Sequence, residues 1–176
     1  MRAAVAQRQR FDVRTALAFC DSTLARPPKR STIVRVAGVG RCVVRFVLPL
    51  ELCLPTNRVA RAGFASSKWK LAKLKQDCFL AMLLQAGRAD YPLRGRPMVR
   101  CVRFSSVEPD RYNDGFKVAI DRLRAKPGGL GYIVDDSPKH AQVEQWWEYA
   151  PPGSGCGLVE VWTGAPIDLQ PRRASA

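Results

Sequence analysis

The sequence predicts an α+β protein, a small mixed domain that combines strands with helices. Four segments have the composition or the alternation of strands, at residues 42–48, 98–104, 141–149 and 158–163. Two segments repeat apolar residues at the three- and four-residue spacings of helices, at residues 67–86 and 113–125. The chain has 176 residues, of which 47% are hydrophobic, so it can bury one sizeable core.

The two ends of the chain are predicted to lie outside this domain. Residues 1–40 form a basic extension, residues 41–164 the folded domain, and residues 165–176 a flexible C-terminal tail. A short helix at residues 12–19 has only a thin apolar stripe. We expect the extension to be either mobile or laid on DNA.

The first two strand predictions rest on Val- and Leu-rich composition and on alternation. Residues 42–48 are the strongest strand segment before Pro49 interrupts it, and residues 54–58 then form a loop. Residues 98–104 alternate apolar and basic side chains. This alternation predicts a half-buried strand with a basic face.

The last two strands are predicted at residues 141–149 and 158–163, joined by a Pro- and Gly-rich turn at residues 151–155. Adjacent side chains on a strand point to opposite faces of the sheet. Of the neighbours Trp146 and Trp147, one therefore lies in the core and the other at a dimer surface or in solvent.

The helix predictions rest on apolar stripes. In residues 67–86 the stripe is Leu71, Leu74, Cys78, Met82 and Ala86. The first half of this segment also carries the basic residues Lys68, Lys70, Lys73 and Lys75. In residues 113–125 the apolar face is Phe116, Ala119, Ile120 and Leu123.

The charge balance of the chain indicates a polyanionic partner. Lys and Arg number 29 against 15 Asp and Glu, which gives a formal net charge of +14 and a pI near 10.2. Such a field attracts nucleic acid and makes its binding salt-dependent. The alternative is that the Arg-rich composition reflects coding bias alone.

The six cysteines do not indicate a metal site. None forms a C-x-x-C pair, and the single histidine, His140, is distant from them in the sequence, so a structural zinc site is poorly supported. Free cysteines fit a reducing compartment, and no signal peptide or membrane-spanning segment is visible. We therefore expect a soluble cytoplasmic protein with no membrane partner.

Acidic residues gather around the second predicted helix. The group of charged and polar residues there is Asp110, Asn113, Asp114, Lys117, Asp121, Asp135 and Asp136. Clustered carboxylates repel one another unless a cation neutralises them, and a shared Mg²⁺ explains the group most simply. Mg²⁺ held by Asp oxygens would polarise a phosphate and activate water, while Lys117 would stabilise the developing charge.

Each of these residues also has a structural interpretation. Asp110 or Asn113 could cap the helix, and Asp114 could interact with its N-terminal dipole. Lys117 and Asp121 have the spacing of an ordinary helical ion pair. The combined order of the residues favours the chemical interpretation over these separate ones.

That order resembles the RusA-type Holliday junction resolvases. The family has a D-x-D-N-x-x-K-x-x-x-D segment followed by an apolar-D-D turn, and residues 110–121 and 133–136 match in order. Residues 54–58 resemble the Pro-x-Asn loop of the family, and the likeness spans residues 43–163. Two departures exist: Tyr112 replaces the second acid, and the Asn-to-Lys spacing is one residue longer.

The resemblance implies a RusA-like fold, with a mixed sheet of about four strands and two main helices on it. It implies a homodimer that uses Mg²⁺ and cuts branched DNA with paired nicks. Asp110 and Asp136 are then metal ligands with Lys117 as a catalytic residue, and Asp114 is our hypothesis for the missing acid. The expected DNA-binding residues are Asn57, Arg58, Lys68, Lys70 and Lys73, and the expected supporting residues are Asn113, Asp121 and Asp135.

Two other functions remain open from the sequence. One is a non-catalytic DNA-binding protein that retains the resolvase fold after the loss of one acid. The other is a basic RNA-binding or structural protein in which the acidic group is incidental. Cleavage of a labelled junction separates the first of these from the enzyme.

Overall fold

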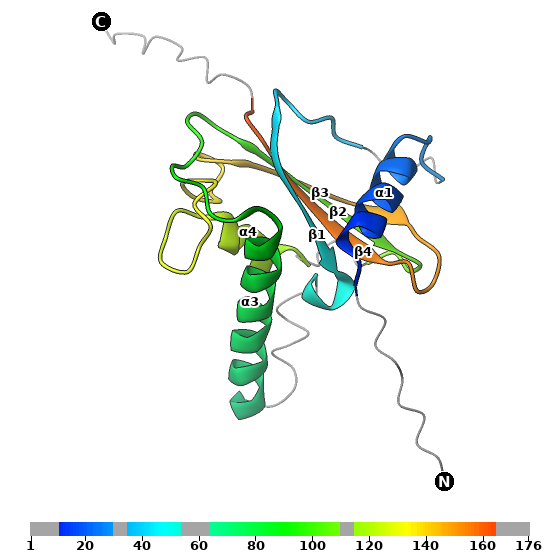
Figure 1. Cartoon of the computed structure of the whole chain (residues 1–176), viewed down its shortest axis with the longest axis horizontal. Helices are drawn as coiled ribbons and strands as arrows, with labels where there is room; N and C mark the ends of the chain where they lie inside the picture. The colour runs from blue at the N-terminus through cyan, green and yellow to red at the C-terminus, as the bar shows by residue number, and fades with distance from the viewer. Residues whose placement is uncertain (1–10, 30–34, 54–63, 110–114, 165–176) are drawn as a thin grey trace, which may run out of the picture.

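A four-stranded mixed sheet forms the centre of the molecule, with helices on both of its faces (Figure 1). The computed structural model describes residues 11–29, 35–53, 64–109 and 115–164, with side chains from residue 68 onward in the third range. The strands are β1 (Cys42–Pro49), β2 (Met98–Ser105), β3 (Gln142–Tyr149) and β4 (Cys156–Trp162). The helices are α1 (Val13–Leu24), η1 (Leu50–Leu52), α3 (Phe64–Ala86) and α4 (Lys117–Leu123). The predicted α+β class and the four-stranded mixed sheet are confirmed.

The strand order in the sheet is β1-β4-β2-β3. Strand β4 pairs antiparallel with both β1 and β2, whereas β2 and β3 are parallel. The turn at residues 151–155 joins β3 to β4 as predicted, but these two strands are not neighbours because β2 lies between them. The last strand of the chain is therefore an interior strand.

Helices α3 and α4 cover one face of the sheet and enclose the larger core. Buried side chains of the sheet such as Phe46 and Val159 pack there with Met82 of α3 and Ile120 of α4. Helix α3 is also tied to the edge strand β1 through Gln85. The Val47 amide donates to Gln85 Oε1 at 2.8 Å, and Gln85 Nε2 donates to the Val47 carbonyl at 2.9 Å.

Helix α1, from the segment predicted as a basic extension, covers part of the opposite face of the sheet. Cys20 is fully buried in a second apolar cluster with Phe104 and Leu158, and the Phe19 and Phe104 rings lie 5.7 Å apart. Asp12 caps the helix by accepting from the Arg14 amide at 3.1 Å. The helix ends five residues later than predicted. Its own apolar stripe is thin, and contacts with apolar side chains of the sheet bury it.

Strand β2 does not have the exposed basic face that its alternation predicts. All of its side chains are buried except those of Arg100 and Arg103, which are partly exposed, and the Arg100 side chain is only 12% exposed. The Arg100 guanidinium lies between the rings of Trp146 and Trp162, 5.3 and 5.2 Å from their centroids, and it pairs with Glu160. Arg100 therefore takes part in internal packing, and Arg103, the other arginine of the strand, donates from Nη1 to the Cys53 carbonyl at 2.7 Å.

The prediction that one of the two adjacent tryptophans on β3 is buried is confirmed. Trp147 is buried and its Nε1 donates to the Ser105 carbonyl at 3.0 Å, while Trp146 is only partly buried beside Arg100. Helix α3 begins three residues earlier than predicted, at Phe64, and α4 ends at Leu123. Within the described ranges, no helix has the length and apolar character needed to cross a membrane.

Candidate functional site

The loop after α4 folds back along the helix and brings two acids to it. The Leu130 amide donates to the Arg122 carbonyl at 2.6 Å, and the Ile133 amide donates to the Leu123 carbonyl at 3.1 Å. Gly129 permits this close return, since a Cβ there would lie 2.0 Å from the Arg124 carbonyl oxygen. The residues that follow, 135 and 136, are thereby placed beside the polar side of α4.

We define the α4 charge cluster as Lys117, Asp121, Arg124, Asp135 and Asp136. Lys117 Nζ lies 2.5 Å from Asp136 Oδ2 and 3.4 Å from Asp121 Oδ1. Arg124 Nη1 lies 3.3 Å from Asp136 Oδ1 and 3.5 Å from Asp121 Oδ1, and its Nη2 pairs with Asp135. Acids from a helix and from a distant loop thus share two cationic partners.

The protonation states in the cluster follow from these contacts. The hydrogen bond to Asp136 raises the pKa of Lys117 above its usual value, although partial burial acts against it. Burial tends to raise the pKa of Asp136, but the hydrogen bond and charge of Lys117, with the charge of Arg124, bring it below the usual value. At neutral pH Lys117 is therefore an ammonium and Asp136 a carboxylate, so Lys117 is suited to stabilise negative charge and not to act as a base.

The structure brings together four of the predicted site residues, namely Lys117, Asp121, Asp135 and Asp136. The predicted residues Asp110, Asn113, Asp114, Asn57 and Arg58 lie outside the described residues. Arg124 is a member of the cluster that the sequence interpretation missed. The signal available was its position three residues after Asp121 at the end of the helix, which is a spacing that brings side chains together.

The described part of the chain does not by itself fit a Mg²⁺ ion. In it, no three His, Cys, Asp or Glu side chains are grouped so that they could hold a metal. Each carboxylate of the cluster already contacts Lys117, Arg124 or both, and three carboxylates against two cations leave a single negative charge. A metal site that includes Asp136 would need a further ligand from Asp110 or Asp114.

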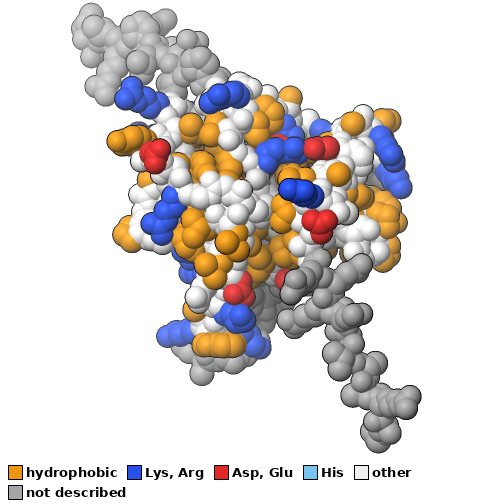
Figure 2. Space-filling model, viewed as in Figure 1, with side chains coloured by type: hydrophobic (Ala, Val, Ile, Leu, Met, Phe, Trp, Pro, Cys, Tyr) orange, Lys and Arg blue, Asp and Glu red, His pale blue; other side chains and the backbone are white. Residues whose placement is uncertain are grey.

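The predicted DNA-binding lysines lie on the first half of α3, which extends away from the sheet (Figure 1). Lys68, Lys70 and Lys73 are exposed, and Lys73 Nζ is 3.1 Å from Asp77 on the same helix. Figure 2 shows blue side chains at that end of the molecule. A shallow groove of about 360 Å³ between α3 and the α4 region is lined by Lys75 and Arg122 among others. Basic groups therefore continue from α3 to α4.

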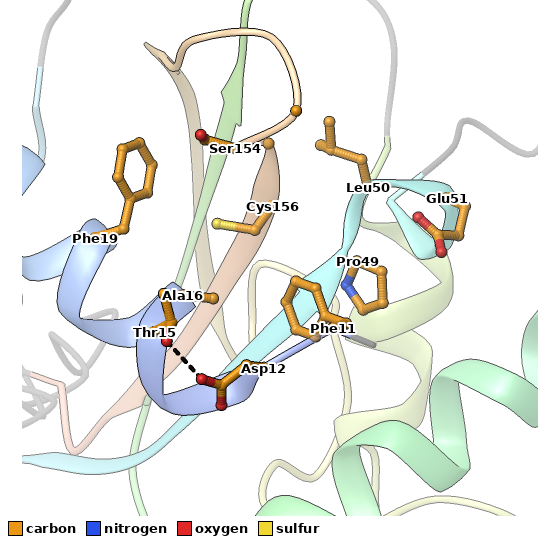
Figure 3. Close-up of a pocket in the computed structure, with 12 residues that line it drawn as sticks. Phe11, Asp12, Thr15, Ala16, Phe19, Pro49, Leu50, Glu51, Ser154 and Cys156 are labelled. Atoms are coloured by element: carbon orange, nitrogen blue, oxygen red, sulfur yellow. Dashed lines mark hydrogen bonds between the residues drawn. The ribbon is translucent and has the colours of Figure 1, made fainter. Parts of the chain in front are cut away.

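A second cavity, of about 530 Å³, lies on the other side of the sheet and contains none of the predicted site residues. Helix α1, the η1 turn and the loop at residues 153–155 enclose it (Figure 3). Asp12 and Glu51 contribute two acidic groups, and Cys156 contributes a thiol. This cavity shares no lining residue with the α4 charge cluster.

No protein-family model matches the chain, and searches of curated proteins and of solved structures find no match. The likeness to the resolvase family therefore rests on the order of residues in the sequence.

Proposed function

We propose that the protein is a Mg²⁺-dependent, structure-selective endodeoxyribonuclease that cuts Holliday junctions or other branched DNA. The observation that carries the proposal is the contact of Lys117 with both Asp121 and Asp136. Lys117 and Asp121 are one helical turn apart, and the loop after α4 brings Asp136 to Lys117. All three occupy positions of the resolvase-like pattern, which supports the proposal. The excess of 14 positive charges supports a nucleic acid as the substrate.

The residues would divide the work as follows. Asp136, with Asp110 and Asp114, would hold the ion, which when bound polarises a phosphate and activates water. Lys117 carries a positive charge at neutral pH and would donate to a phosphate oxygen as charge develops on it. Arg124 orients Asp135 and Asp136 through its two nitrogens.

The basic side chains of α3 would hold the DNA backbone. Lys68 and Lys70 are exposed on the part of α3 that extends from the sheet, and the groove lined by Lys75 and Arg122 leads towards α4. Lysines spaced around a helix neutralise phosphates and do not read bases. A homodimer would present two such sites to the two strands of a branched substrate, in keeping with paired nicks.

A second candidate function is DNA binding without cleavage. It is favoured by the contacts in the α4 charge cluster, where every carboxylate already meets Lys117 or Arg124. Such a cluster is compatible with a stable fold in the absence of any metal ion. The two proposals share the DNA surface and differ in whether Asp136 takes part in chemistry.

A nicking assay separates the two proposals. A labelled synthetic four-way junction and a linear duplex of the same sequence are each incubated with the full chain, with Mg²⁺ or with EDTA. We expect cleavage of the junction alone, with loss of cleavage in EDTA and in Asp136→Asn. The matched control is Asp90→Asn, because Asp90 is exposed and lies outside the cluster.

Each outcome of this assay decides between the functions. Salt-sensitive binding of the junction without cleavage would reject the enzyme and support the second candidate. Equal cleavage by the wild type and by Asp136→Asn would reject the site. Failure to bind either DNA at low salt would contradict both proposals.

A further inference from the structure

Two buried cysteines that are 136 residues apart in the chain meet between α1 and β4. Cys20 Sγ lies 3.5 Å from Cys156 Sγ, and the two residues are 0% and 2% exposed. A disulfide bond has an S–S length of about 2.05 Å, so the atoms need to approach by only about 1.5 Å. The contact is a hydrogen bond between thiols, and both cysteines are free in this structure.

The cavity beside α1 gives a small molecule access to one member of this pair. Cys156 lines the cavity together with Thr15 and Phe19 of α1 and Leu50 of η1. In Figure 3 the sulfur of Cys156 points from β4 towards α1. The cavity has a volume of about 530 Å³, which is large enough for a drug-sized molecule. Cys20 does not line this cavity, which makes Cys156 the thiol that a reagent meets first.

The pair also has the chemistry of a nucleophile with a partner. The hydrogen bond from Cys20 lowers the pKa of the Cys156 thiol, while burial acts in the opposite direction. The thiolate is the form of cysteine that attacks a disulfide, so Cys156 is the better nucleophile of the two.

We propose that Cys20 and Cys156 form a thiol pair that a small-molecule disulfide, such as oxidised glutathione, converts into a bond joining α1 to β4. The Cys156 thiolate attacks one sulfur of the reagent, and the first glutathione leaves as a thiolate. The hydrogen bond with Cys156 and burial raise the pKa of Cys20, so Cys20 is a thiol that must first lose its proton to the departing thiolate or to solvent; its sulfur then attacks the mixed disulfide and releases the second glutathione. The pair loses two electrons, which reduce the reagent, and its two protons pass to the released thiolates or to solvent.

Closing this bond fixes α1 on the sheet. Helix α1 is otherwise held by the apolar contacts of Cys20 and Phe19 and by the pair of Asp21 with Arg45 at 2.5 Å. Arg35 also donates to the carbonyls of Thr23 and Leu24 at the end of the helix and pairs with Glu148 of β3. A cross-link between positions far apart in the chain restricts the unfolded state and so stabilises the folded one. We expect the oxidised protein to unfold at a temperature higher by at least about 5 °C. This inference does not depend on the proposed nuclease function.

The experiment oxidises the full chain with glutathione buffers of graded ratio and maps the disulfides by mass spectrometry. We expect a peptide pair linked through Cys20 and Cys156 and a rise in Tm that a dithiol reductant reverses. Cys20→Ser should instead hold one glutathione at Cys156 without the rise in Tm. The control Cys42→Ser should behave as the wild type, because Cys42 is half-exposed and its Sγ contacts the Val44 carbonyl.

Peptide mapping of the wild type decides the proposal even where a variant fails to fold. A folded wild-type protein that keeps both thiols free at ratios that modify Cys42 would overturn it. A cross-link between Cys156 and a different cysteine would overturn it as well. Recovery of the 20–156 pair without a rise in Tm would refute the stabilising role of the bond.

Discussion

Lys117 and Arg124 together contact all three carboxylates of the α4 charge cluster. Lys117 contacts the helix acid Asp121 and the loop acid Asp136, while Arg124 contacts those two and Asp135. Because the cluster is only partly exposed, these contacts are less screened than surface ion pairs. At the scale of single residues, the same contacts stabilise the loop and set the charge of the proposed site.

Asp136→Asn should have a lower unfolding free energy than the wild type, by an amount that depends on pH. The folded-state pKa of Asp136 lies below 3.8, so its contribution is present above that value and disappears as pH falls through the folded pKa. The contribution of Lys117, whose pKa is raised, is complete at neutral and lower pH. We expect Asp136→Asn to lose about 1 kcal/mol of unfolding free energy at pH 7.

Urea unfolding at several pH values tests this expectation. The difference between the wild type and Asp136→Asn should shrink towards zero in acid, whereas Asp90→Asn should match the wild type throughout. A difference that stays constant from neutral pH to acid would show that the carboxylate charge is not its source.

Gly129→Ala should destabilise the protein through a backbone collision. A Cβ at this position would lie 2.0 Å from the Arg124 carbonyl oxygen, so the loop must move away from α4. We expect a loss of about 2–3 kcal/mol and weaker contacts of Asp135 and Asp136 with the helix. Thermal unfolding measures the loss, and Gly95→Ala is the control.

The control separates steric collision from backbone strain. Gly95 has a φ of +83° with nothing within 4 Å of an added Cβ, so its replacement suffers only from conformation. We expect a loss of about 1 kcal/mol there. An effect of Gly129→Ala no larger than that of Gly95→Ala would contradict the collision.

Among the elements, α3 has two separate tasks. Its second half packs on the sheet through buried side chains such as Cys78 and Met82, and Gln85 satisfies the outer backbone groups of Val47 on the edge strand. Its first half extends from the sheet and carries exposed lysines. One half of the helix thus packs on the core, and the other half carries exposed basic side chains.

Gln85→Leu should weaken the attachment of α3 to β1. The amide and carbonyl of Val47 would each lose a partner, and partly buried groups without partners are unfavourable by about 1–3 kcal/mol. Hydrogen exchange should report faster exchange at the Val47 amide. Gln76→Leu, on an exposed position of the same helix, should leave that amide unchanged. Equal exchange rates in both variants would argue that Gln85 does not protect the edge.

For the whole molecule, the net charge of +14 predicts that DNA binding falls steeply with salt. Lys70→Ala should reduce the slope of log K against log salt by about 1, with little change between DNA sequences. The matched control is Arg94→Ala, because Arg94 is exposed in the loop between α3 and β2 and is not among the predicted DNA-binding residues. Fluorescence anisotropy at several salt concentrations measures the slopes. Equal slopes for both variants would remove Lys70 from the DNA surface.

Particular residues explain how far the sequence could predict this molecule. Local periodicity is sufficient for α3 and for the strands, because the same side chains that alternate or recur also make the core. Local sequence does not tell which side chains pack against each face. Helix α1 packs on Phe104 and Leu158, and Arg100 lies between two tryptophans from other strands. For the site, the order of residues singled out Lys117, Asp121 and Asp136, but the predicted grouping of Asp136 with Asp110 and Asp114 lies outside the described residues. The contacts of Asp136 and Arg124 depend on the path of a loop, which local sequence does not specify.

The place of β4 in the sheet has a consequence for how the protein is made. Strand β4 is the last of the four to be synthesised, yet both β1 and β2 pair with it, and among the described residues β4 is the strand with which β1 pairs. Until residues 156–162 have been synthesised, β1 lacks the strand that it pairs with, and α3 is among the elements already made that pack on its apolar side chains. Sheet formation therefore waits for the synthesis of β4, and until then β1 is a strand without its partner, which favours aggregation of incomplete chains.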